Sequence, residues 1–217
     1  NKVDADNADY DNVVAQLKDV FGPSVVPVQF PVECGPGFNS VVDVLLMKQL
    51  TWKPEGGTPT ITEIAPELMD KAKEWNQALV EAAAENDETL MDKFFDKGSL
   101  NEDEMRAGIR EGLIQRSIYP VFCVSALKDM CVRRMMEFLG NVVPFVSDMP
   151  APVDKEGKEI KPDANGPLSL YFFKTTVEPH IGEVSYFKVM SGTLKPGADL
   201  NNVTRGSKER IAQVNVV

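Results

Sequence analysis

Residues 118–128 have the sequence Ile-Tyr-Pro-Val-Phe-Cys-Val-Ser-Ala-Leu-Lys, an apolar run followed by the tetrapeptide Ser-Ala-Leu-Lys. A short run of this kind is typical of a strand that is buried on both faces in a parallel sheet. The pattern of residues 131–139 predicts a helix soon after the tetrapeptide. A strand, a loop and a helix in this order predict an α/β fold, in which ligands bind beyond the carboxyl ends of the strands.

A second tetrapeptide, Asn-Lys-Val-Asp, occupies residues 1–4. The apolar residues within residues 9–21 have helical spacing, and Asp6 or Asn7 is the expected N-cap. Because both tetrapeptides precede helices, they can converge at one edge of the same sheet. We therefore expect a single ligand site built from both loops.

The residue types in the two tetrapeptides suit a guanine base. Guanine presents its N1–H and its N2 amine side by side, and the carboxylate of Asp4 can accept from both. Adenine lacks that amine, so discrimination by about 10⁴ or more is expected. The stems of Lys2 and Lys128 can cover the base while their ammonium groups stay in water. An amide near Ala126 can donate to O6. Asn1 can either satisfy the acceptor edge of the base or hold the two loops together. The candidate guanine-binding residues are Asn1, Lys2, Asp4, Ser125, Ala126, Leu127 and Lys128.

Composition argues against several other classes of function. The chain has 217 residues and a formal net charge of −10, which disfavours a broad nucleic-acid-binding surface. No apolar run approaches the ~20 residues of a membrane helix, so we expect a cytoplasmic protein with no membrane partner. The three cysteines form no C-x-x-C pair, and His180 is the single histidine. We therefore expect free thiols, no disulfide framework and no metal site.

The order of predicted elements divides the chain into five segments. Residues 1–25 and 115–149 carry the two tetrapeptides and belong to one α/β domain. Residues 26–114 are expected to form an α+β subdomain inserted into it. Residues 150–166 have the polar composition of a linker, and residues 167–217 alternate apolar and polar residues as antiparallel strands do.

Local patterns predict further elements within these segments. Residues 66–85 have an apolar stripe at helical spacing, with Pro66 in the first turn of the helix. Strands are predicted over residues 25–32, 41–50 and 211–217, and the prolines of the first suggest an edge strand or an irregular one. The other predictions are a helix over residues 87–96 that buries Leu90, Met91, Phe94 and Phe95, and a third helix that Asn101 caps.

The acidic residues are concentrated in one part of the chain, because residues 61–105 contain 13 acidic and four basic residues. On the predicted helix over residues 66–85, the acidic side chains lie away from the apolar stripe. They are either a solvated helix face or a docking surface for a basic partner. The candidate partner-binding residues are Glu67, Asp70, Glu74 and Glu81.

The chain resembles elongation factor G and related ribosomal translocation GTPases over essentially its whole length. Residues 1–4 match the N-K-x-D motif of that family, and residues 125–128 match its S-A-x-K motif. The family has a large insert between these motifs and a β-barrel after them. Residues 26–31, 38–43 and 79–85 are similar to the insert, and residues 173–182 and 191–197 are similar to the opening of the barrel.

This resemblance implies the C-terminal half of a P-loop-type GTPase domain with an α+β insert, followed by the start of an antiparallel β-barrel. It implies a segment that recognises the guanine base of GTP or GDP and docks on the ribosome during translocation. The acidic helix would meet the ribosomal stalk protein. A ribosome-protection or release-type factor and a non-catalytic ribosome-binding module remain alternatives. The basic residues that would contact ribosomal RNA are Lys188, Lys195, Arg205, Lys208 and Arg210.

Several positions depart from the family pattern and predict a divergent paralogue. The family usually has Gly before the S-A-x-K serine, where Val124 stands, and an Arg where Ala5 stands. It has Asn-Lys-Gly soon after the motif, where residues 129–131 are Asp-Met-Cys. No G-x-x-x-x-G-K-[ST] phosphate loop occurs in the sequence, and the D-x-x-G segment belongs upstream of Asn1. We therefore expect an internal fragment that does not hydrolyse GTP alone, with Mg²⁺ binding confined to the full-length parent.

Overall fold

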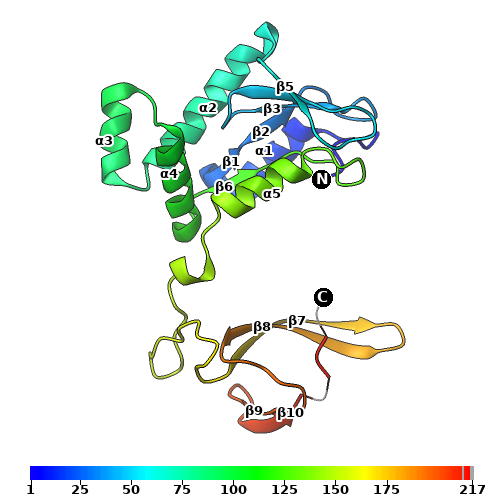
Figure 1. Cartoon of the computed structure of the whole chain (residues 1–217), viewed down its shortest axis with the longest axis vertical. Coiled ribbons are helices and arrows are strands. Elements are labelled where there is room, and N and C mark those ends of the chain that lie inside the picture. Colours follow the sequence, from blue (N-terminus) through cyan, green and yellow to red (C-terminus); the bar gives the residue numbers. More distant parts are fainter. Residues whose placement is uncertain (212, 216–217) are drawn as a thin grey trace. The chain divides into compact units, whose positions relative to one another are not determined.

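The computed structural model describes residues 1–211 and 213–215. It has a mixed α/β fold that divides into two compact units, Asn1–Pro144 and Phe145–Val217 (Figure 1). The five-segment division drawn from the sequence stays a prediction.

A parallel strand pair lies at the centre of the first unit. Strand β1 (Val25–Pro27) pairs in parallel with β6 (Tyr119–Val121), with Val26 opposite Pro120. Helices α1 (Tyr10–Phe21) and α2 (Met69–Ala84) both pack against β1. Helix α5 (Val132–Asn141) follows β6 through the second tetrapeptide.

Two details of this region differ from the sequence prediction. The N-cap of α1 is Asp9, whose carboxylate accepts a hydrogen bond from Asn12 N at 3.0 Å, and not Asp6 or Asn7. Only three residues of the predicted strand over residues 118–124 enter the sheet, and Tyr119 is 41% exposed. The described residues place no further strand beside the pair, and none of the three residues of β6 is fully buried, so β6 is not buried on both faces.

The predicted strand over residues 25–32 is two strands in different sheets. Val28 N donates to Val121 O at 2.9 Å, and Val28 O accepts from Val44 N at 3.0 Å. Val28 therefore transfers the chain from the parallel pair to an antiparallel sheet with the order β2-β3-β4-β5. The strands of this inserted sheet are β2 (Gln29–Pro31), β3 (Ser40–Asp43), β4 (Lys48–Thr51) and β5 (Thr60–Thr62).

The predicted strand over residues 41–50 is likewise divided, into the hairpin of β3 and β4. Its turn includes Met47, which has a φ of 51°. The carboxylate of Asp43 accepts from the main-chain amides of Leu45 and Leu46 at 3.1 and 3.0 Å. An Asp that caps a tight turn in this way ends the strand, although the surrounding apolar residues have strong β propensity.

The helices of the inserted subdomain follow the sequence more closely. A 3-10 turn (Pro66–Leu68) leads into α2, which buries the predicted apolar stripe. Helix α3 (Glu88–Lys97) buries Leu90 but leaves Phe95 76% exposed, so the predicted burial of Phe95 is wrong. Helix α4 (Glu102–Gln115) begins with the predicted cap, because Asn101 and Glu104 form a reciprocal capping box.

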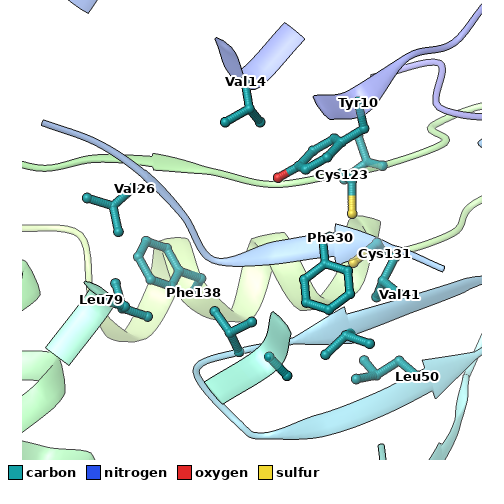
Figure 2. Packing of buried hydrophobic residues seen from close by; sticks show 14 of the residues in the cluster. Tyr10, Val14, Val26, Phe30, Val41, Leu50, Leu79, Cys123, Cys131 and Phe138 are labelled. Atoms are coloured by element: carbon teal, nitrogen blue, oxygen red, sulfur yellow. The ribbon is translucent and has the colours of Figure 1, made fainter. Parts of the chain in front are cut away.

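One hydrophobic core joins these parts of the first unit. Figure 2 shows side chains from α1, α2 and α5, from the parallel pair and from the inserted sheet gathered around Phe30 and Phe138. The inserted subdomain is therefore packed into the α/β layer and shares its core. Among the described residues, every buried hydrophobic side chain lies between Val3 and Val142.

The second unit is built from two hairpins. Strand β7 (Ser169–Glu178) pairs with β8 (Gly182–Ser191), and β9 (Asp199–Asn202) pairs with β10 (Ser207–Arg210). Before β7 there is one short 3-10 turn (Val146–Asp148) and an isolated bridge between Val153 and Glu159.

The predicted strand over residues 211–217 is not confirmed. Residues 211 and 213–215 form no strand, and residues 212, 216 and 217 lie outside the described residues. None of the helices within the described ranges combines the length and the apolar character that a bilayer crossing requires.

Candidate functional site

The first motif loop, residues 1–4, contacts the segment that connects β6 to the second tetrapeptide. Val3 is buried, and its amide donates to Val124 O at 3.4 Å. Its carbonyl accepts from Gly35 N at 2.8 Å. The backbone on the N-terminal side of Asp4 is therefore held from two directions, while Asn1 and Lys2 stay exposed.

The second motif loop, residues 125–128, is closed by its own serine. Ser125 is fully buried, and it exchanges two main-chain hydrogen bonds with Met130, at 3.2 and 3.0 Å. The hydroxyl of Ser125 also accepts from Lys128 N at 3.4 Å. These bonds present Leu127 at the tip of the loop, where 93% of its surface is exposed.

The structure brings the two motif loops together. Asn1 Oδ1 accepts from Lys2 N at 2.8 Å and from Ala126 N at 3.2 Å, so one carboxamide joins loops that are 125 residues apart. A second contact joins them, because Lys128 Nζ lies 3.8 Å from Asp4 Oδ2. The expectation that the two loops share one edge of the sheet agrees with this geometry, whereas guanine binding itself stays a prediction.

One group is placed differently from the sequence prediction. The Lys128 ammonium group was expected to stay in water, but it contacts both Asp4 and Pro36 O, the latter at 3.4 Å. The expected donor to guanine O6 was an amide near Ala126, and the Ala126 amide itself is bonded to Asn1. Among the described residues the amide of Leu127 has no hydrogen-bond partner, so it is the available donor at the tip.

The carboxylate of Asp4 has the environment that a selective acceptor needs. Only 14% of its side-chain surface is exposed, and a hydrogen bond shielded from water is stronger than one in bulk solvent. Two cavities of the first unit, of about 340 and 610 Å³, are lined by other residues. The motif loops therefore offer an open edge with a shielded acceptor and an exposed donor. Among the described residues, no group of acidic, His or Cys side chains is arranged to hold a metal ion.

The residues that depart from the family pattern keep an unusual backbone shape. Asp129 has a φ of 50° and Cys131 a φ of 64°, a left-handed conformation that favours Asn and Gly. These are the two positions where the family has Asn and Gly. The thiol of Cys131 donates to Gln29 Oε1 at 3.0 Å, and burial raises its pKa to about 12.

A buried polar network below the second motif loop was not predicted from the sequence. Asp43 Oδ2 accepts from Arg134 Nε at 2.8 Å and from Gln29 Nε2 at 2.9 Å, and Asp43 and Gln29 are fully buried. The network joins the inserted sheet to α5. No local pattern connects Asp43 with Arg134, which lies 91 residues away.

The candidate partner-binding residues are all exposed, on the 3-10 turn and on α2. Asp70, Glu74 and Glu81 are four and seven residues apart, so they project from the same face of α2. The basic side chains proposed to contact RNA are also exposed, and Lys188 Nζ lies 5.8 Å from the centre of the Phe173 ring. Both surfaces stay predictions.

No protein-family model matches the sequence. Among solved structures, the crystal structure of the protein ttk003000868 from Thermus thermophilus is similar, with a TM-score of 0.66 at 23% sequence identity. The match covers 94% of this chain and 28% of that one. The two proteins share a fold. This chain spans little more than a quarter of the length of that neighbour.

Proposed function

We propose that this chain is a guanine-recognising segment of a translational GTPase related to elongation factor G. The observation that carries the proposal is the hydrogen bond from Ala126 N to Asn1 Oδ1, which joins the two motif loops. With Asp4 Oδ2 only 3.8 Å from Lys128 Nζ, the acidic end of one motif meets the basic end of the other. The ordered pair of motifs, together with this geometry, favours a purine site over two unrelated loops.

In this proposal Asp4 accepts from guanine N1–H and from the N2 amine. The Leu127 amide donates to O6, and the stems of Lys2 and Lys128 cover the faces of the ring. The contact between Asp4 and Lys128 is long and partly exposed, so giving it up costs little. Adenine would leave the shielded carboxylate without a donor, which is the physical basis of the selectivity.

Phosphate chemistry needs groups that these 217 residues do not include, because no phosphate-loop motif occurs in the sequence. The contribution of this chain is therefore recognition of the base, and GTP hydrolysis is an activity of the longer protein. Purified chain with excess GTP should release phosphate at the rate of buffer alone. Clear turnover would contradict this division of roles.

A titration followed by amide NMR tests base recognition directly. Guanosine 5′-monophosphate should shift the resonances of residues 1–4 and 125–128, whereas adenosine 5′-monophosphate should not. Asp4→Ala should abolish the response, and Asp6→Ala is the matched control because Asp6 is exposed and lies outside the motif. Equal responses to both nucleotides, or no response to either, would refute the proposal.

Docking on the ribosome is the second part of the proposal, and exposed charge supports it. The acidic face of α2 suits a basic partner such as the stalk protein, and the basic side chains of the second unit suit ribosomal RNA phosphates. A ribosome-protection or release-type factor would use the same surfaces. A non-catalytic ribosome-binding module would sediment with ribosomes but show no preference for guanine, so the NMR titration separates it from a GTPase segment.

A further inference from the structure

We propose that the inserted sheet is itself part of the purine site, because two of its turns position the motif loops for guanine. The first turn is residues 34–37, between β2 and β3, and the second turn is residues 53–57, between β4 and β5. This inference rests on the proposed guanine recognition and adds positioning residues that neither motif contains.

The first turn contacts both motif loops. Gly35 N donates to Val3 O at 2.8 Å, and Pro36 O accepts from Lys128 Nζ at 3.4 Å. Gly35 is buried and has a φ of 92°, a conformation that glycine adopts readily. Adjacent residues of one turn thus set the positions of the main chain beside Asp4 and of the Lys128 side chain.

The second turn is packed against the main chain of the second motif loop. A Cβ at Gly56 would lie 1.9 Å from Lys128 O, so only glycine allows this approach. The turn is fixed from behind, because Trp52 Nε1 donates to Gly57 O at 3.0 Å. Beside it, Arg133 Nη1 donates to Thr58 Oγ1 at 3.4 Å. The turn therefore limits how far the second motif loop can move away from the first.

These contacts matter because guanine selectivity depends on a distance. The donor at Leu127 and the acceptor at Asp4 belong to different loops, and one base must meet both. The bond from Ala126 N to Asn1 Oδ1 is exposed, and the buried bond from Val3 N to Val124 O is long, at 3.4 Å, so these two bonds do not fix the separation alone. The inserted sheet supplies the rigid support, as residues around a binding site commonly do.

Two glycines of the first unit provide a matched test. Gly56 and Gly98 both have positive φ, 76° and 68°, so alanine is strained at either position. Gly98 is exposed at the end of α3, outside both turns, and a Cβ there meets no atom within 4 Å, whereas at Gly56 it must separate the turn and the loop by roughly 1 Å. Comparing Gly56→Ala with Gly98→Ala therefore isolates the contact with Lys128 from the cost of the backbone conformation.

The measurement is the affinity for guanosine and inosine 5′-monophosphates, followed by amide NMR. Inosine lacks the N2 amine, so the wild-type chain should prefer guanosine by about tenfold. Gly56→Ala should weaken guanosine binding by about tenfold and bring the two affinities together, because a 1 Å misplacement disrupts oriented contacts. Gly98→Ala should keep both the affinity and the preference of the wild type.

Each outcome has one meaning. If the wild-type chain binds neither nucleotide, the proposed function fails. If it binds guanosine and both alanine variants behave alike, guanine recognition stands and the positioning role is refuted. Should Gly56→Ala not fold, Trp52→Phe loosens the same turn without a clash by removing its hydrogen bond to Gly57. That variant should lower the guanosine preference by about threefold, and an unchanged preference would refute the inference.

Discussion

Replacing Asp43 by asparagine should destabilise the first unit by about 3 kcal/mol, because the change breaks a buried ion pair. The Asp43 carboxylate is fully buried and accepts four hydrogen bonds, from Arg134, from Gln29 and from the amides of Leu45 and Leu46. An amide keeps the volume and can still accept from the two main-chain amides. It leaves the Arg134 guanidinium, 13% exposed, with only the exposed carboxylate of Glu137, 3.7 Å away, as a counter-charge.

Urea unfolding followed by tryptophan fluorescence measures this loss, because Trp52 and Trp75 both lie in the first unit. Adding Arg134→Met to Asp43→Asn removes the stranded charge. The double variant should therefore lose less unfolding free energy than the two single variants lose together, by about 1–3 kcal/mol.

A surface ion pair supplies the control for this experiment. Glu63→Gln breaks the exposed contact with Lys48 and should cost less than about 1 kcal/mol. A loss below about 1 kcal/mol for Asp43→Asn, or strict additivity in the double variant, would show that the Asp43 network does not hold the inserted sheet to α5.

Three further predictions concern pH, docking and the second unit. Burial raises the pKa of Cys131 from 9.0 to about 12, so this thiol's contribution to stability is complete below pH 9. The contribution should fall by about 1.4 kcal/mol per pH unit above pH 9, because there the unfolded chain loses this proton before the folded chain does. If the urea midpoints of the wild type and of Cys131→Ala drop equally as the pH rises above 9, this prediction is contradicted. Glu74→Lys with Glu81→Lys should weaken binding to purified stalk protein at low salt by about tenfold, by reversing two charges on one face of α2, and unchanged affinity would favour a solvated face. Limited proteolysis should cut within residues 150–166 first, because no helix or regular strand protects them, and first cleavage inside the first unit would refute that expectation.

Local signals predicted the helices well. Amphipathic spacing and capping act within a few residues, so α2 and α4 begin close to Pro66 and Asn101 as the sequence indicates. Phe95 is the exception, because apolar character alone does not show whether a neighbouring element covers a side chain. In this structure Phe95 contacts the ring of Phe94 and otherwise faces outward.

The strands were harder to predict, because pairing depends on distant partners. The sequence of residues 25–32 predicts one strand. In the structure the two halves belong to different sheets, because Val28 forms hydrogen bonds with Val121 of one sheet and with Val44 beside the other. Pro27 and Pro31 suggest an edge or irregular strand, but no local signal places the transfer at Val28.

The candidate site was likewise predictable only in part. The motif loops could be identified from residue types at fixed spacing, and the chemistry of Asp4 follows from a carboxylate facing two donors. The supporting turns could not be identified, because Gly56 meets Lys128 only after the inserted sheet has folded against the second motif loop. The left-handed backbone at Cys131 could not be predicted either, because cysteine has no preference for positive φ.

The most direct test of the central claim is the base preference of Asp4→Asn. Asparagine can donate to the C2 carbonyl of xanthine, while it no longer offers guanine a carboxylate. The amide NMR titration should give tighter binding of guanosine than of xanthosine 5′-monophosphate for the wild-type chain, and the reverse order for Asp4→Asn. If the variant still binds guanosine more tightly than xanthosine, Asp4 does not recognise the base and the proposed guanine site is refuted.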